Sequence, residues 1–399
     1  MNNKEIELLG KKFEEDIINW RRYLHEHPEL SMHEVETAQF IYEKLLSFST
    51  DLLVQRPTQT SVIARLKGRK PGKVLALRAD IDALPIEEQT DLTFRSTRKG
   101  VMHACGHDGH TAMLLGAVRI LVELQDKLHG EVVFIFQHAE ELASGADEIL
   151  NTGVLKDVDC ILGGHLYNQV PVGQFGLALG RMMSASDGFD IMITGKGGHA
   201  AEPDQAQDLI YLGTEIVQSF SQLIARQVNA NDQAIISVTK FNAGSANNVL
   251  PDQVQIGGCT RTFSDTTREF ILHQIQEIVE TLSTLYGAKG TIEWTKGATA
   301  VINHSEVTDA VRAVIENNFG KDAVHILSPH MISEDFGSYL KEIPGNFLFI
   351  GSGNPKEGIT YPLHHPKFTF DEQALLNGTL LHVMTALTLP RALDDITMK

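Results

Sequence analysis

Three short apolar runs, Val74–Leu77, Val132–Phe136 and Cys160–Leu162, contain no charged or amide side chain. Strands that are covered on both faces have this composition, because neither side of the sheet meets water. Between the first two runs, Ala112–Leu124 has apolar residues at helical spacing, and Glu14–Phe48 predicts two helices joined by a turn at its proline. Strands that alternate with helices predict an α/β fold with a mostly parallel central sheet.

After Met183 the pattern changes to that of a smaller domain. The expected elements are, in order, strand Gly188–Thr194, helix Asp208–Arg226, strand Ala234–Asn242, strand Gln253–Phe263, helix Thr267–Tyr286 and strand Gly290–Thr295. This β-α-β-β-α-β order is that of ferredoxin-like α+β domains. A chain of 399 residues exceeds the usual size of one hydrophobic core. We therefore interpret residues 185–298 as a domain inserted into a larger one, formed by residues 1–184 and 299–399.

Charge and cysteine content exclude several classes of protein. The formal net charge of -17 disfavours binding to nucleic acid or to an anionic membrane surface. The first nine residues lack the apolar core of a signal peptide, and no segment reads as a membrane span. Three cysteines argue against a disulfide framework and fit a reducing compartment. We expect a cytoplasmic protein.

The densest cluster of chemically active residues is the run HACGHDGH, His103–His110. It holds three of the 17 histidines and one of the three cysteines. Thiolate and imidazole are the ligands that borderline divalent metals prefer, and the two glycines allow tight backbone turns. The alternative is a polar loop before a helix, in which Asp108 or Thr111 caps the helix start. The run therefore predicts a metal site, with the capped loop as the competing interpretation.

Polar residues follow two other predicted strands. Gln137–Glu141 comes after Val132–Phe136, and His165 comes directly after Cys160–Leu162 and two glycines. Open α/β sheets place their sites at the carboxyl ends of parallel strands. Glu140 and Glu141 would point to opposite faces of a regular strand, so both can serve one site only if the strand breaks there. Their alternative role is at a solvated helix start.

Two more histidines, His364 and His365, lie in the proline-bounded loop Tyr361–Pro366. A single loop histidine is more often inert than a ligand. Together with the earlier clusters, however, this loop completes a set of nitrogen, oxygen and sulfur donors from four separate segments, which is a common construction for a catalytic metal centre.

Motifs along almost the whole chain resemble the M20 metallopeptidase and amidohydrolase family, in its aminoacylase, hippurate hydrolase and auxin-conjugate hydrolase branch. The motifs that carry the resemblance are, in chain order, Arg21–His25, Pro28–Leu30, Leu77–Pro85, His103–His110, Ala139–Glu141, Gly197–Ala201, Asn248–Asp252, Ser333–Phe336 and Leu363–His364. The sequence departs from the branch at His138, where relatives usually have proline, and at His365, where they often have a small polar residue. The departures leave the substrate preference open.

The resemblance implies a centre of two divalent metal ions, Mn or Zn by preference and Co or Ni as alternatives. The implied metal ligands are Cys105, His107, Glu141, His165 and His364. Glu140 would act as general base, and Asp80 and Asp108 would orient the ligands from outside. In the inserted domain, which would serve in dimerisation or as a lid, His199 would reach the active site of a neighbouring subunit. The resemblance therefore implies a homodimer or a higher homo-oligomer.

Two residues of the inserted domain are candidates for binding the carboxylate of a substrate. Arg261 could do so by a bidentate pair, and its alternative is a surface position on a strand. Asn248 precedes Val-Leu-Pro-Asp and could equally be a turn residue.

The implied reaction is hydrolysis of the amide bond of an N-acyl amino acid by a metal-activated water, with Glu140 as the base. Within the family, an N-acetyl-diaminopimelate deacetylase and a dipeptidase are the alternatives. Outside catalysis, a metal-binding relative without activity is the alternative, although a purely structural centre has no need of Glu140. The segment Gly195–Ala200 fits a loose dinucleotide-binding pattern, but the helix that should follow it is delayed. No G-x-S-x-G motif of a serine hydrolase is present.

Overall fold

The computed structural model describes residues 3–392, and these residues divide into two compact units. The large unit comprises the chain up to Met182, the segment Ile302–Pro329 and the chain from Asp335 onward. The small unit comprises Met183–Val301 and His330–Glu334. Each unit has its own hydrophobic core.

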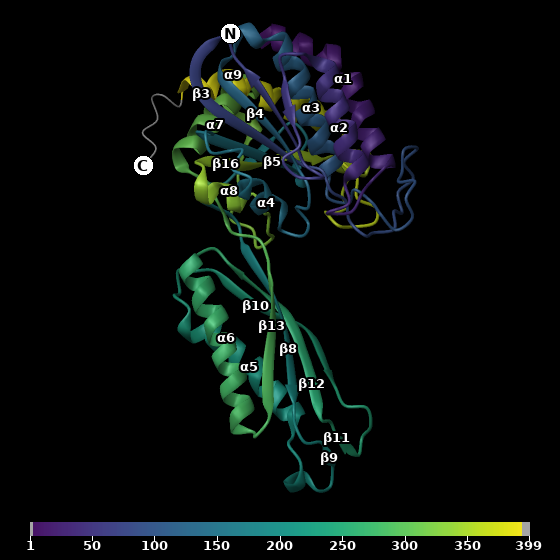
Figure 1. The fold of residues 1–399 in the computed structure, drawn as a ribbon, viewed down its shortest axis with the longest axis vertical. Helices are drawn as coiled ribbons and strands as arrows, with labels where there is room; N and C mark the ends of the chain where they lie inside the picture. Colours follow the sequence, from purple (N-terminus) through teal and green to yellow (C-terminus); the bar gives the residue numbers. More distant parts are fainter. Residues whose placement is uncertain (1–2, 393–399) are drawn as a thin grey trace. The chain divides into compact units, whose positions relative to one another are not determined.

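An eight-stranded sheet forms the centre of the large unit (Figure 1). Its strands are, in spatial order, β1 (Leu53–Gln55), β2 (Val62–Lys67), β4 (His129–Gln137), β3 (Lys70–Asp80), β5 (Cys160–Pro171), β16 (Gly345–Gly353), β6 (Phe175–Leu177) and β15 (Val324–Ile326). The four long neighbours β4, β3, β5 and β16 all run parallel. Antiparallel pairing is confined to β1 with β2, β2 with β4, and β16 with β6. The prediction of a mostly parallel central sheet is confirmed.

Helices cover this sheet, which explains why its strands are apolar on both faces. They are α1 (Asn3–Glu26), α2 (Val35–Phe48), α3 (His107–Glu123), α4 (Gly145–Asn151), α7 (Ser305–Phe319), α8 (Gly337–Glu342) and α9 (Gln373–Ala392). Helices α1, α3 and α9 all contact one another, and α9 also contacts β3, β4 and β16. Residues 132–137 of β4 are consequently all buried. Among the described residues, no helix combines the length and the hydropathy that a membrane span requires.

The small unit is an antiparallel sheet with two helices on one face (Figure 1). In chain order its main elements are β8 (Ala185–Thr194), α5 (Leu209–Gln227), β10 (Ala234–Ala243), β12 (Gln253–Thr262), α6 (Asp265–Leu285) and β13 (Lys289–Lys296). The spatial order of the strands is β10-β12-β8-β13. Burial alternates along β8, because only the face toward α5 and α6 is covered. The predicted ferredoxin-like α+β arrangement is confirmed.

The remaining elements are short. Strands β9 (Gly198–His199) and β11 (Val249–Leu250) pair as one small antiparallel sheet, and β7 (Arg181–Met183) pairs with β14 (Val301–Ile302) as another. Single 3-10 turns are formed by Gln125–Lys127, Pro203–Gln205, Lys321–Ala323 and Pro355–Glu357.

One predicted strand boundary is wrong. His165 was expected just beyond the end of a strand, but β5 continues through it to Pro171. Gly163 and Gly164 do not break the strand; they accommodate its neighbours. A Cβ atom at Gly163 would lie 2.6 Å from the ring of Phe336 and 2.8 Å from that of Phe347. Glycine inside a strand thus marks a close approach of other side chains here.

Adjacent leucines of α2 provide a test of the core. Leu45 is fully buried, whereas 51% of Leu46 is exposed. We expect Leu45→Ala to lower the free energy of unfolding by about 2–5 kcal/mol, because it removes transfer energy and leaves a cavity. Leu46→Ala should change it by less than about 0.5 kcal/mol. Urea unfolding followed by tryptophan fluorescence measures both, because Trp20 packs on Phe48 at the end of α2 and contributes to the signal. Equal effects of the two substitutions would contradict this account of α2.

Candidate metal centre

The run His103–His110 is divided between a loop and a helix. Gly106 has a φ of +90° and lies at the N-cap position, so Cys105 ends the loop and His107 begins α3. Glycine tolerates this left-handed conformation, which other residues rarely adopt. The cap role considered for Asp108 and Thr111 is wrong. The Thr111 hydroxyl donates to the Asp80 carbonyl oxygen, and Asp108 bonds to Arg21 and His25.

Donor atoms from four segments meet beside this helix start. The Cys105 Sγ lies 3.3 Å from Nε2 of His165. The Glu141 Oε1 lies 3.5 Å from Nε2 of His364 and 4.0 Å from Nε2 of His107. Cys105 belongs to two groups of three donors whose atoms lie within 4.8 Å of one another, one with His107 and His165 and one with Glu141 and His364. Both groups thus include the Cys105 thiol, which as a thiolate would serve as a metal ligand.

Glu140 and Glu141 both lie at this donor cluster because β4 ends before them. The strand stops at Gln137, and Ala139 adopts a φ of +49° in the turn that follows. Helix α4 starts only at Gly145, so the alternative reading of the two glutamates as a helix start is wrong. Glu140, Glu141 and His107 form a further group of donors within 4.8 Å. The chain thus places a second carboxylate directly beside the candidate ligands.

The carboxyl-terminal loop is anchored to the same place by its backbone. His364 has a φ of +63°, and its N–H donates to the carbonyl oxygen of Ala104 at 2.8 Å. Its side chain remains about half exposed, unlike those of His107 and His165. His364 therefore lies at the open side of the donor cluster, where a small molecule could enter.

The two buried histidines are oriented by hydrogen bonds on their outer nitrogens. Nδ1 of His165 is 2.8 Å from the carbonyl oxygen of Leu166, which accepts its proton and leaves the Nε2 lone pair directed at Cys105. Burial lowers the pKa of His165 well below its ordinary value and so keeps the ring neutral. Nδ1 of His107 lies 3.1 Å from the carboxylate of Asp82. Although burial lowers the pKa of His107, Asp80 and Asp82 raise it to about 10.

These residues fit a divalent cation. Nε2 of His107 and Oε1 of Glu141 are buried, and within residues 3–392 neither has a hydrogen-bond partner. Burial, followed by the charges of Glu141 and Glu140, raises the pKa of the Cys105 thiol well above its ordinary value. Metal binding requires the thiol to be deprotonated, and a bound divalent cation would favour the thiolate that the neighbouring carboxylates disfavour.

Asp80 and Asp82, two residues apart at the end of β3, accept hydrogen bonds from His110 and His107, respectively. Asp82 accepts from His107, from the Glu141 N–H at 3.0 Å and from Ser31 at 2.7 Å. Asp80 accepts from Nδ1 of His110 at 2.6 Å, and Nε2 of His110 accepts the Leu166 N–H. Both nitrogens of His110 are therefore engaged within the protein. Sequence reasoning missed Asp82, although its spacing from Asp80 was a usable signal.

Asp108 does not contact any of the five candidate ligands through a hydrogen bond in the described chain. Its Oδ2 accepts from Arg21 and from His25, each at 2.9 Å. Burial opposes its charge, but Arg21 and His25 hold the pKa of Asp108 far below its ordinary value. Asp108 therefore anchors helix α1 to the start of α3.

His138 and His365, the two departures noted above, have local partners. Nε2 of His138 is 2.9 Å from the carboxylate of Glu148 on α4, and the His138 ring is buried. The ring of His365 stacks on Tyr361 at 4.5 Å, and its Nδ1 accepts the Lys367 N–H.

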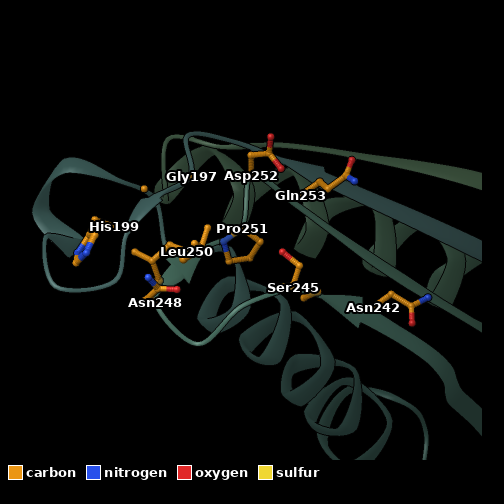
Figure 2. Close-up of a pocket in the computed structure, with 13 residues that line it drawn as sticks. Gly197, His199, Asn242, Ser245, Asn248, Leu250, Pro251, Asp252 and Gln253 are labelled. Atoms are coloured by element: carbon orange, nitrogen blue, oxygen red, sulfur yellow. The ribbon is translucent and has the colours of Figure 1, made fainter.

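The other candidate residues belong to the small unit. His199 and Asn248 are exposed and line one hollow of about 780 Å³ beside β9 and β11 (Figure 2). Asn248 lies in a turn that the Val249 N–H closes by donating to the Ala246 carbonyl oxygen, and its own carbonyl oxygen accepts the Ala200 N–H from the β9 segment. Arg261 lies on β12, outside the lining of this hollow, and donates to Ser333 at 2.8 Å. The structure thus brings His199 and Asn248 together, apart from Arg261.

Comparison with known proteins shows the family to which the chain belongs. Residues 76–388 match the model of peptidase family M20/M25/M40. The chain belongs to this family. It is 47% identical over 307 residues to an N-acyl-L-amino acid amidohydrolase of Geobacillus stearothermophilus, covering 77% of this chain and 83% of the relative. It is 40% identical to an N-acetylcysteine deacetylase of Bacillus subtilis, covering 92% and 95%.

A solved member of the family has the same fold. The YXEP protein of Bacillus subtilis, described as a dinuclear metal-binding peptidase of the M20 family, superimposes with a TM-score of 0.82 at 36% identity, covering 95% of this chain and 99% of that one. The predicted family is confirmed, as is the prediction of a metal-dependent enzyme that hydrolyses amide bonds.

The contact between Asp82 and His107 predicts an effect on metal affinity. We expect Asp82→Asn to raise the dissociation constant for Mn²⁺ about 10- to 100-fold, because the amide binds the imidazole less firmly in its orientation. Titration calorimetry on chelated protein measures it. Asp108→Asn is the matched control, since Asp108 is equally buried but contacts Arg21 and His25. An equal loss in Asp108→Asn would give Asp108 the orienting role instead.

Proposed function

We propose that this enzyme hydrolyses the amide bond of N-acyl amino acids at a centre of two divalent ions. The observation that carries the proposal is the convergence of five donors around a thiol that two groups share. Cys105, His107, Glu141, His165 and His364 would hold the ions. Mn²⁺ or Zn²⁺ suits this set of sulfur, nitrogen and oxygen donors best, with Co²⁺ or Ni²⁺ as alternatives.

When bound, such ions activate a water molecule and polarise the acyl carbonyl group. Glu140 is the residue of this chain that we assign as general base. It lies beside Glu141, and its Oε1 accepts the Asp335 N–H at 3.4 Å, which orients the carboxylate. It would take the proton of the attacking water and pass it to the departing amine. His107 and His165, with their outer nitrogens engaged, would present only Nε2 to the site.

We assign substrate binding to residues of the small unit. Residues 185–298 would also serve as a dimerisation or lid domain. His199 would stabilise the oxyanion in the active site of a second subunit, which makes the enzyme a homodimer or a larger homo-oligomer. Its exposure on a two-residue strand beside Asn248 supports this role. Asn248 and Arg261 would bind the substrate carboxylate.

The substrate class rests on the relatives. The names of the two similar enzymes refer to N-acyl and N-acetyl amino acids, and both align over most of their length. We also propose a cytoplasmic location, because the three cysteines are all free, as expected in a reducing compartment.

A panel of amides tests the function. Amine release would be measured with ninhydrin on N-acetyl, N-benzoyl and longer N-acyl amino acids, N-acetyl-diaminopimelate and dipeptides. The protein would be used chelated and then reloaded with Mn²⁺ or Zn²⁺. We expect release from N-acyl amino acids only after reloading. Release from dipeptides alone would reassign the enzyme as a dipeptidase, and no release from any compound would contradict the proposal.

The two neighbouring glutamates should differ in their effects on metal content and turnover. Glu140→Gln should retain the metal and lose about 10²- to 10⁴-fold in kcat, since an amide cannot accept the proton. Glu141→Gln, the matched control, should lose metal as well as turnover. Metal analysis and the ninhydrin assay decide. Near-normal turnover by Glu140→Gln would remove Glu140 from the mechanism.

A mixed dimer tests the role of His199. Glu140→Gln and His199→Ala subunits, carrying different tags, would be produced together and the mixed dimer purified. If His199 acts on the neighbouring subunit, one active site receives both intact residues, so the mixed dimer should be active while both parent variants are nearly inactive. An inactive mixed dimer would show that His199 acts within its own subunit, whereas an active His199→Ala parent would show that His199 does not act in the reaction.

A further inference from the structure

The turn that carries Glu140 and Glu141 has a backbone conformation that needs support. Ala139 precedes the two glutamates, is fully buried and has a φ of +49°. This left-handed region is disfavoured for residues with a Cβ atom and persists only where surrounding contacts hold it. With a right-handed or extended Ala139, the chain would leave β4 in a different direction, and the two carboxylates would point elsewhere.

Each backbone N–H on either side of Glu140 is held by a buried carboxylate. Oε1 of Glu34 accepts the Ala139 N–H at 2.8 Å, and Asp82 accepts the Glu141 N–H at 3.0 Å. The Ala139 carbonyl oxygen closes the turn by accepting from the N–H groups of Ser144 and Gly145. Glu34 reaches this turn from 105 residues away in the sequence.

Glu34 has no comparable role in its own helix. It is the N-cap residue of α2, but its side chain makes no capping hydrogen bond. Its side chain is completely buried, and within residues 3–392 its second oxygen, Oε2, has no hydrogen-bond partner. Burying a carboxylate is costly, so a residue that only capped α2 would be better served by a shorter, exposed side chain. The contact with Ala139 joins this buried carboxylate to a distant part of the chain.

We infer that Glu34 is a positioning residue, whose carboxylate holds Ala139 in the left-handed conformation and thereby aims Glu140 and Glu141 at one site. The inference rests on the roles proposed above for these two glutamates. It extends the site to a segment, Ser31–Glu34, that also supplies Ser31 as a hydrogen-bond donor to Asp82. The short loop before α2 thus supplies Glu34, one of the two carboxylates that hold the turn, and its Ser31 binds the other, Asp82.

Three variants separate this role from a general effect on stability. Glu34→Asp withdraws the carboxylate by about 1.5 Å, the length of one carbon–carbon bond, and places a better N-cap residue on α2. Glu34→Gln keeps an oxygen acceptor at the original reach. Glu29→Asp is the matched control, because Glu29 is also buried and accepts the Thr37 N–H of the same helix, without a hydrogen bond to the turn.

We expect Glu34→Asp to lower kcat at least tenfold and to weaken Mn²⁺ binding by a similar factor, with KM within threefold and an unchanged or higher melting temperature. Glu34→Gln should recover kcat to within threefold of the wild type, and Glu29→Asp should stay within the same range. Wild-type kcat and Mn²⁺ affinity in Glu34→Asp would overturn the inference. So would equal losses in Glu34→Gln or in Glu29→Asp.

Failure of the proposed function is visible separately. A wild-type enzyme that hydrolyses no N-acyl amino acid would contradict the function, whereas the Mn²⁺ affinities of the three variants would still decide the role of Glu34. A crystal structure of Glu34→Asp gives the same decision directly: a left-handed Ala139 in that variant would overturn the inference.

Discussion

The guanidinium group of Arg78 connects the strand ends on which the candidate site is built. It is buried near the end of β3 and donates to Asp80 at 2.5 Å, to Gln137 at 2.8 Å and to Asp335 at 2.9 Å. Removing one partner of such a buried pair costs about 3–5 kcal/mol, because it leaves a charge without compensation. These contacts join β3, the end of β4 and a segment more than 250 residues farther along the chain. Asp80 then holds His110, and the Asp335 N–H holds Glu140.

Beyond this network, buried carboxylates fix the positions of the side chains and the backbone around the donor cluster. Asp82 binds the candidate ligand His107 on the side away from the cluster, and Asp80 binds the neighbouring His110. Glu34 and Asp82 also bind the backbone of the turn that bears Glu140 and Glu141. Imidazole nitrogens that are engaged on the outside present only their other nitrogen inward. The result is a group of mostly buried donors, with His364 at the exposed side. Sulfur, nitrogen and carboxylate donors gathered in this way suit a divalent cation.

The small unit is built on a different principle. Its sheet is covered on one face by α5 and α6, and it is a compact unit with its own core. Two of its candidate residues are exposed rather than buried among hydrogen-bond partners. His199 and Asn248 lie exposed at paired two-residue strands, where backbone hydrogen bonds hold them. Residues in such a place suit contact with a molecule or subunit that arrives from outside.

Local sequence patterns were sufficient for the class of fold, the family and the donor types. Apolar runs predicted the strands, and the crowding of histidines and a cysteine in His103–His110 predicted the metal site, because these signals depend on residue type and short spacing. Sequence alone also showed that Glu140 and Glu141 could share a site only if the strand broke there. Only the tertiary structure decided how the strand breaks, through a left-handed Ala139 and a carboxylate from Glu34. The tertiary structure also gave Asp82 and Asp108 different roles, since Asp82 orients His107 and Asp108 binds Arg21 and His25. It further showed that β5 continues through two glycines, which lie close to neighbouring side chains. Hydrogen bonds and close contacts of this kind join residues that are distant in the chain, and neither periodicity nor composition records which distant residues meet.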